Sequence, residues 1–283
     1  MVTLKSDKLT LEISPIGAEI HHVIDANGIE RIWQNETGIW ASHTPLLFPI
    51  AGAIKDDTWF YEGKPYTMTK HGFVRSSEFT VEEASDNRAV LALTGEKMKH
   101  AGYPFDCELR VIYTLCGDEV KIEYNLKNVG DKEAWFSIGS HEGYACKGGI
   151  ENFEVVFPDD DELVQTELDG SLLKHVTHTW KLNNHVLTVK PDDFLNDALA
   201  FCSLKSRTVT IRRKDQAYAA TVNFPQCDTL FVWQKVGAEF LCLEPWCNAP
   251  DYVDCDQQLT HKPGMMNVAA GADKTVTHTI RFH

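Results

Sequence analysis

The sequence has few basic residues and no long apolar run. Its 27 Lys and Arg are outnumbered by 41 Asp and Glu, which gives a formal net charge of −14. A negative potential repels phosphate backbones and anionic lipid headgroups, so nucleic acid and membrane surfaces are not expected partners. No stretch approaches the roughly 18–20 apolar residues that cross a bilayer, and the first residues lack the apolar stretch of a signal peptide. We therefore expect a soluble, cytoplasmic protein.

Cysteines are present, but their spacing gives no redox or metal motif. No two of them form a Cys-x-x-Cys pair, and most lie inside apolar runs such as Leu241-Cys-Leu. Such thiols behave as small hydrophobic side chains in a reducing compartment. We expect reduced, buried thiols at the eight positions, which are Cys107, Cys116, Cys146, Cys202, Cys227, Cys242, Cys247 and Cys255.

The common cofactor and metal motifs are also missing. The absence of Gly-x-Gly-x-x-Gly, a P-loop and Gly-x-Ser-x-Gly argues against nucleotide cofactors and serine hydrolases. The dipeptide at 141–142 begins like a zinc-binding His-Glu-x-x-His, but Ala145 stands where the second ligand would be. His175, His178 and His185 have a spacing that a metal could use, yet no cysteine or acidic ligand falls in register, and a polar strand face explains them. We predict no metal and no cofactor.

Helical periodicity is nearly absent, and two-residue alternation of apolar and polar residues takes its place. Close-set turn signals such as Asp25-Ala-Asn-Gly separate the alternating runs. This pattern predicts an all-β fold of packed antiparallel sheets, and only the segment that begins at Pro191-Asp-Asp favours a short helix. The expected strands cover residues 9–13, 89–93, 109–113, 120–124, 186–189, 209–211, 218–222, 230–233 and 276–280.

No linker divides the chain. No Pro/Gly/Ser-rich stretch separates two halves, no charge block marks a tail, and no repeat of about 20–50 residues recurs. A chain of 283 residues is long enough to form one large β unit with its own core. We predict a single β domain over residues 1–283, with its site in loops or on a concave sheet face.

A histidine and an arginine lie four residues apart in His71-Gly-Phe-Val-Arg75. In extended structure the two side chains fall on the same side of the chain. Imidazole supplies a hydrogen bond or a proton near neutral pH, and guanidinium supplies a charged fork that suits hydroxyl pairs, carboxylates or phosphate. The residue types leave two interpretations open, which are a ligand-binding pair or an exposed histidine beside an arginine that pairs with a surface acid.

A second histidine lies in a glycine-flanked turn. Ser137-Ile-Gly-Ser leads from an apolar strand into His141, and Glu-Gly follows. A tight turn at a strand end is a suitable place for a general acid. An ordinary turn residue fits the same pattern equally well.

The most informative segment is Phe240-Leu-Cys-Leu-Glu244-Pro-Trp246, where a carboxylate closes an apolar run. Burial of an unpaired carboxylate is costly, and partial burial raises its pKa and makes it a stronger base. The alternative is a structural ion pair, with Arg75 as the candidate partner. Trp246 and Trp233 offer flat apolar faces that either stack on a sugar ring or fill core volume.

Together these segments resemble the aldose 1-epimerase (galactose mutarotase-like) family, in particular its LacX-like branch. The resemblance covers most of the chain, and its specificity comes from the order and approximate spacing of many short motifs. They are Ile16-Gly-Ala-Glu-Ile, Ile32-Trp-Gln, Pro45-Leu-Leu-Phe-Pro-Ile-Ala-Gly, Gly63-Lys-Pro-Tyr, His71-Gly-Phe-Val-Arg75, the Ser140-His141 turn, Asn196-Asp197-Ala-Leu-Ala-Phe, Phe231-Val-Trp-Gln and Cys242-Leu-Glu244-Pro-Trp246.

The resemblance implies a large antiparallel β-sandwich, with the sugar on a concave sheet, and a mutarotation mechanism. Glu244 matches the general base, which removes the proton of the anomeric hydroxyl, and His141 matches the general acid, which protonates the ring oxygen. The opened aldehyde rotates about C1–C2 and closes on its other face. Proton transfer is the whole chemistry, so no cofactor is implied.

The resemblance also implies a set of sugar-binding residues. His71 matches the residue that binds the sugar near its reacting end, and Asp197 matches a carboxylate that holds ring hydroxyls. Arg75, Trp233 and Trp246 complete the predicted substrate-binding set.

Two positions depart from the family pattern. Where relatives commonly have Phe-Pro-x-x-Gly-Arg, Ala53 follows Gly52, so a cation is missing unless Lys55 replaces it. The usual His-Pro-Ala-Phe turn is replaced by residues 141–144, which puts the carboxyl of Glu142 beside the proposed acid. We expect both changes to affect substrate choice.

Three functions remain open from the sequence. The first is a mutarotase for a free hexose such as galactose or glucose, working as a monomer or homodimer with a small sugar as its only expected partner. The second is a hexose-6-phosphate mutarotase, motivated by Arg75, although Ala53 and the net negative charge weigh against it. The third is a non-catalytic carbohydrate-binding or sensing domain, which would not need the Glu244 and His141 pair.

Overall fold

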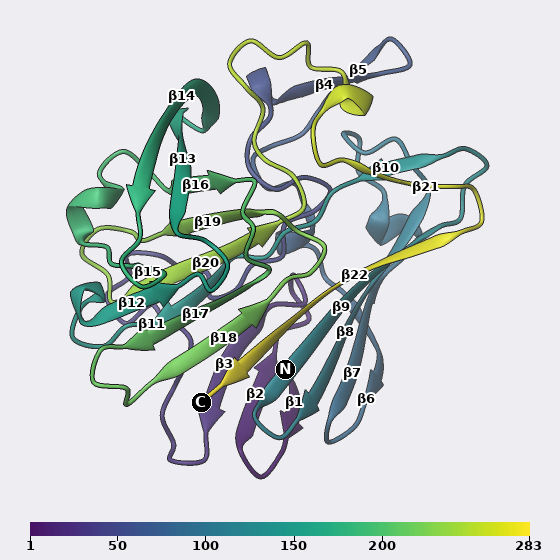
Figure 1. Cartoon of the computed structure of the whole chain (residues 1–283). Helices are drawn as coiled ribbons and strands as arrows, with labels where there is room; N and C mark the ends of the chain where they lie inside the picture. Colours follow the sequence, from purple (N-terminus) through teal and green to yellow (C-terminus); the bar gives the residue numbers. More distant parts are fainter.

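The computed structural model describes all 283 residues and consists almost entirely of antiparallel strands (Figure 1). The helices are six 3₁₀ segments of three or four residues each. They are η1 (Lys55–Asp57), η2 (Val74–Ser76), η3 (Gly95–Met98), η4 (Ile150–Asn152), η5 (Pro191–Phe194) and η6 (Leu259–His261). The all-β prediction is confirmed, and the expected short helix at residue 191 is η5.

The larger of the two main sheets has nine strands. Its long central strands, β22, β9 and β8, run side by side (Figure 1). In sheet order the strands are β15 (Val186–Leu187), β12 (Phe153–Val156), β17 (Thr208–Arg213), β18 (Ala219–Asn223), β22 (Asp273–Phe282), β9 (Glu119–Asn128), β8 (Cys107–Cys116), β7 (Arg88–Leu93) and β6 (Thr80–Ala84).

The second main sheet has six strands and carries the Glu244 segment on its second strand, next to the edge strand β11. Its order is β11 (Glu142–Ala145), β20 (Phe240–Trp246), β19 (Thr229–Trp233), β16 (Leu199–Cys202), β13 (Glu162–Asp169) and β14 (Leu172–Lys181). Smaller sheets pair β1 (Val2–Lys5), β2 (Leu9–Ile13) and β3 (Ile20–Asp25), then β4 (Thr58–Tyr61) with β5 (Lys64–Thr67), and β10 (Ala134–Phe136) with β21 (Met266–Val268).

The nine runs predicted as strands all fall on strands of the structure, but the other strands were not predicted, and several strands are longer than expected. Each expected run lies in or overlaps a strand, and β8, β9 and β22 extend to ten residues each. The run at 186–189 forms a strand only at Val186–Leu187. Long antiparallel pairs extend beyond their apolar cores because backbone hydrogen bonds continue through polar positions.

One hydrophobic cluster of 65 buried residues joins the two main sheets and spans the chain from Val2 to Phe282. Because side chains alternate along a strand, Leu230 and Leu243 point into this core, where they join Val111 of the nine-stranded sheet. The protein is therefore a single-domain antiparallel β-sandwich, as predicted.

The outer face of β19 and β20 is also covered, which sets the position of the site. All seven residues of β20 are buried, and Leu47, Ala51 and Trp33 of the preceding loops pack on this outer face. A strand that is covered on both faces has the near-continuous apolar sequence of Phe240-Leu-Cys-Leu. Glu244 is thus an acid placed between two apolar layers.

The eight cysteines are all free, but they are not uniformly buried. Cys116 is exposed, and Cys202 and Cys255 are partly exposed, so the expectation of burial holds at the other five positions. No helix in the chain is long and apolar enough to cross a membrane.

Candidate active site

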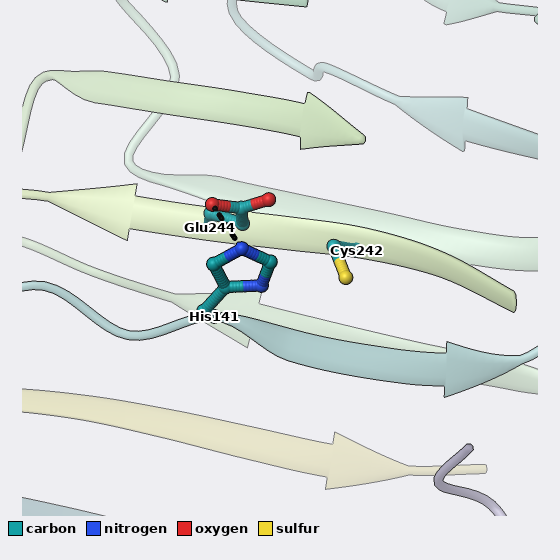
Figure 2. A group of neighbouring side chains, drawn as sticks. All are labelled: His141, Cys242 and Glu244. Carbon is teal, nitrogen blue, oxygen red and sulfur yellow. Dashed lines mark ion pairs between the residues drawn. The ribbon is translucent and has the colours of Figure 1, made fainter. Parts of the chain in front are cut away.

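The pairing of β11 with β20 brings the two proposed catalytic side chains together. Glu142 pairs with Leu243 in this antiparallel register, and one step further along the register His141 lies opposite Glu244. The His141 Nε2 atom is 3.3 Å from a Glu244 carboxylate oxygen, and Figure 2 shows the two groups pointing at one another. His141 and Glu244, which are 103 positions apart in the sequence, are direct cross-strand neighbours.

Burial holds this pair in its neutral protonation states. Glu244 is 2% exposed and His141 is 12% exposed. Desolvation raises the pKa of Glu244 well above its ordinary value and lowers the pKa of His141 to about 3. Over the pH range between these two values the pair shares one proton, which can lie on the carboxyl or on the imidazole without a change in net charge.

The alternative of an ion pair between Glu244 and Arg75 is wrong. The basic group within reach of Glu244 is the His141 imidazole, whereas the exposed Arg75 lies on η2 and forms no ion pair. The segment from His71 to Arg75 is also not extended, because His71 and Gly72 both have a φ of 69°. The two side chains reach the same side through a left-handed turn followed by a 3₁₀ turn.

His71 is fixed in one tautomer by the loop opposite it. The Gly52 N–H donates to His71 Nδ1 at 3.0 Å, and the His71 N–H donates to the Gly52 carbonyl at 2.9 Å. Because Nδ1 accepts, the ring proton is on Nε2. Burial lowers the pKa of His71 well below its ordinary value, with a smaller contribution from His141, so the ring is a neutral hydrogen-bond donor.

This turn depends on Gly72. A Cβ atom at this position would lie 1.9 Å from the Phe48 carbonyl oxygen, which accepts a hydrogen bond from the Phe73 N–H. A glycine is therefore required both for the positive φ and for the close approach of the two loops.

One cleft of about 260 Å³ lies against the outer face of β19 and β20. This volume is below the range of about 300–1,000 Å³ that is usual for drug-sized ligands, so it suits a single small ring. All seven residues predicted from the sequence line it, and they are Glu244, His141, His71, Arg75, Asp197, Trp233 and Trp246.

The two predicted tryptophans have different surroundings. Trp246 is 2% exposed, its ring is stacked on Phe231 with centroids 3.9 Å apart, and its Nε1–H donates to the Ser140 carbonyl. Trp233 is partly exposed and meets the His141 ring edge-on at 5.5 Å. Trp233 is therefore better placed than Trp246 to offer a free ring face to a ligand.

Sequence reasoning missed several lining residues. The most important is Lys70, whose Nζ donates to Ser171 Oγ at 3.1 Å and lies 3.8 Å from an Asp197 oxygen. The missed aromatic residue is Trp40, whose ring centroid is 5.2 Å from that of His141. Lys70 directly precedes His71, so the prediction of His71 as a site residue could have pointed to Lys70. Nothing in the sequence around Trp40 indicated that it lies at the cleft.

Lys55 does not replace the positive side chain that is missing at Ala53. Lys55 does not line the cleft, and Lys70 does. Ala53 is buried, and its carbonyl accepts a hydrogen bond from the Asp251 N–H. The positive charge of the cleft therefore comes from Lys70 and Arg75.

Glu142 does not place its carboxyl beside the His141 ring. Successive residues of a strand point to opposite faces, and Glu142 points into the sandwich. There its carboxylate accepts a hydrogen bond from Ser140 Oγ at 2.8 Å and lies 3.1 Å from His278 Nε2 of β22. Glu142 therefore contacts the turn at residues 140–141 from the core side of the sheet, and its carboxyl does not face the cleft.

A third group, the thiol of Cys242, lies beside His141 and Glu244. Ligand-type atoms of His141, Cys242 and Glu244 all lie within 4.8 Å of one another, and Figure 2 shows Cys242 and Glu244 on the same strand. A metal ion would require a deprotonated sulfur. Burial raises the pKa of the Cys242 thiol well above its ordinary value, so the sulfur is a neutral thiol unless a bound ion displaces its proton.

Comparison with known proteins gives the family of the chain. The family model described as aldose 1-epimerase matches residues 1–281. Protein LacX of Lactococcus lactis subsp. lactis is 28% identical over 281 residues, which cover 94% of each chain.

Solved structures show the same fold. A galactose mutarotase related enzyme from Lactobacillus acidophilus superposes with a TM-score of 0.93 at 27% identity, over 99% of this chain and 96% of the other. A galactose mutarotase-like protein from Lactobacillus casei superposes with a TM-score of 0.90 at 21% identity, over the full length of both chains. The chain belongs to the aldose 1-epimerase family.

Proposed function

We propose that this protein is a mutarotase that interconverts the α and β anomers of a free hexose such as galactose or glucose. The observation that carries the proposal is the His141 and Glu244 pair, which lies 3.3 Å apart at one cleft and shares one proton. With the proton on the imidazole, Glu244 accepts the proton of the anomeric hydroxyl while His141 protonates the ring oxygen.

This step leaves the pair in its neutral form with the open aldehyde bound. Rotation about C1–C2 presents the other face of the carbonyl, and the reverse proton transfers close the ring as the opposite anomer. The same two residues therefore serve both directions, and the chemistry requires no external proton, electron or cofactor.

The remaining cleft residues hold the sugar in this proposal. His71 donates its Nε2 proton near the reacting end, and the Asp197 carboxylate accepts hydrogen bonds from ring hydroxyls. Trp233 offers its ring face, while Trp246 and Phe231 form a stacked apolar wall. We also place the protein in the cytoplasm, which its free thiols support.

Polarimetry tests the proposal. Freshly dissolved α-D-glucose or α-D-galactose should lose optical rotation faster with the protein than with buffer or heat-denatured protein. Calorimetric binding of the same sugars without any acceleration would identify a non-catalytic binding domain instead. The absence of both binding and acceleration would exclude a free hexose as the ligand.

One observation favours a second candidate, which is a hexose-6-phosphate mutarotase. Arg75 lines the cleft, is exposed and has no ionic partner, so its guanidinium is free to bind a phosphate. Competition by glucose 6-phosphate at concentrations where glucose does not compete would support this candidate. Equal or weaker competition by the phosphate would leave the free hexose.

Lys70 is expected to set the pH range of the reaction. Its charge lowers the pKa of both Glu244 and His141, so Lys70→Gln should raise both values. Activity requires the singly protonated pair, which is lost below the pKa of His141 and above that of Glu244. Both limbs of the pH profile of kcat should therefore move to higher pH.

The matched control for this shift is Lys55→Gln, because Lys55 is a nearby lysine in the sequence that does not line the cleft. Its pH profile should follow that of the wild type. A Lys70→Gln profile that superposes on the wild type, or moves to lower pH, would contradict the electrostatic role of Lys70.

A further inference from the structure

A buried asparagine, Asn248, lies behind the loop that contacts His71. Asn248 is 2% exposed, comes shortly after β20 and does not line the cleft. Its Oδ1 accepts a hydrogen bond from the Ala51 N–H at 3.0 Å, and its Nδ2 donates to the Ala51 carbonyl at 3.0 Å. Nδ2 also donates to the Ala249 carbonyl at 2.7 Å, so both amide protons have partners. One partner is a donor and two are acceptors, so only one orientation of the amide fits.

One of these hydrogen bonds reaches His71 through a single peptide group. The Ala51 carbonyl and the Gly52 N–H belong to the same trans peptide, so they point in opposite directions. Asn248 donates to the carbonyl, and the N–H donates to His71 Nδ1 at 3.0 Å. The amide, the peptide and the imidazole thus form a chain in which each group donates to the next. Each bond of such a chain polarises and strengthens its neighbour.

Gly52 leaves the orientation of this peptide weakly determined. Packing requires a glycine here, because a Cβ atom would lie 2.6 Å from Pro250 Cγ. Gly52 has a φ of 79°, but glycine adopts both signs of φ, so the Ala51–Gly52 peptide can rotate by about 180° at little local cost. The rotated peptide would present its carbonyl to His71 Nδ1. The ring proton would then lie on Nδ1, and Nε2 would become an acceptor.

Asn248 opposes this rotation. The rotated peptide would turn the Gly52 N–H toward the Asn248 amide protons, so that donors face each other and the carbonyl loses its partner. We infer that Asn248 is a positioning residue that keeps the His71 proton on Nε2. This inference rests on the proposed mutarotase function, in which His71 donates that proton to the sugar. The His71 ring centroid is 5.7 Å from that of His141, which places the donor beside the reacting end.

The isosteric variant Asn248→Asp tests the inference. At about pH 8, well above the ordinary pKa of an aspartic acid, its carboxylate still accepts from the Ala51 N–H but repels the Ala51 carbonyl. It would accept from the Gly52 N–H of the rotated peptide. We therefore expect the His71 proton to move from Nε2 to Nδ1, which heteronuclear NMR of the imidazole nitrogens measures without any sugar present.

The same variant should change the kinetics in a defined way. KM for glucose or galactose should rise about fivefold, the loss of one neutral hydrogen bond, while kcat changes less because His71 binds the ground state and the transition state alike. Adding Asn248→Asp to His71→Phe should raise KM no further, because Asn248 acts through His71. A further rise in the double variant would contradict this route.

Asn128→Asp is the matched control. Asn128 is 1% exposed, and its amide also makes three hydrogen bonds with backbone groups, but it lies at the end of β9 and does not line the cleft. This variant should lose a similar amount of stability and keep the wild-type KM and the wild-type tautomer of His71. A purely structural role of Asn248 would make the two aspartate variants behave alike.

Asn248→Leu covers the case in which the buried charge prevents folding. Leucine makes neither hydrogen bond and adds no charge, so both tautomers of His71 should be present and KM should rise by a smaller factor. The wild-type tautomer alone in every folded Asn248 variant would overturn the inference, whatever the activity. No acceleration of mutarotation by the wild type would overturn the proposed function, and the tautomer measurement would still test Asn248.

Discussion

Glu244→Gln is expected to lower kcat for mutarotation by about 100- to 10,000-fold, the usual contribution of a positioned general base. Glutamine has nearly the same shape as glutamate, but its amide cannot accept the anomeric proton and return it. The carboxyl is almost fully buried and its pKa is raised well above the ordinary value, so a neutral amide also removes the cost of keeping an acid protonated at neutral pH. The variant should therefore be inactive but no less stable than the wild type.

Polarimetry with α-D-glucose and a thermal melt measure these two effects together. His141→Gln should show a loss of similar size, and the double variant should be little worse than either single variant, because the two residues exchange one proton and act as a unit. Glu96→Gln, at an exposed carboxylate paired with Lys99, is the control and should keep the wild-type rate. Equal rates in all four proteins would exclude the pair as the acid and base.

Two-residue alternation predicted most of the fold, because it reports directly which face of a strand is buried. The same alternation also predicts part of the cleft lining. Cys242, Glu244 and Trp246 lie on one face of β20, and Phe231 and Trp233 lie on one face of β19. The pairing of strands was not predictable in this way. Nothing local in the sequence states that β11 lies beside β20, which places His141 opposite Glu244.

The errors of sequence reasoning came from side-chain direction and from the loops. The carboxyl of Glu142 was placed beside His141 because the two residues are adjacent, although alternation along a strand turns them to opposite faces. The turn at His71 was taken as extended, but a positive φ at His71 depends on the packing of Gly72 against Phe48. Trp40 reaches the cleft from a loop whose course only tertiary packing determines.

The second large effect concerns the buried pair of Glu142 and His278, beneath the turn that carries His141. Glu142 and His278 are 2% and 4% exposed, and they join β11 of one main sheet to β22 of the other. His278→Phe should lower the free energy of unfolding by about 3–5 kcal/mol, because it leaves the Glu142 carboxylate buried without its ionic partner. The phenyl ring keeps the stacked position that the imidazole holds against Tyr124, so lost packing contributes little.

Urea denaturation of a double variant separates the unpaired charge from a general loss of structure. Glu142→Leu combined with His278→Phe should recover most of the stability, because well-packed apolar residues replace a buried ion pair at little cost. His175→Phe is the control, since His175 pairs with Asp254 at an exposed position where such pairs contribute about 0–1 kcal/mol. If His278→Phe is as stable as His175→Phe, or if the double variant is weaker than the single one, the pair does not hold the two sheets together beneath His141.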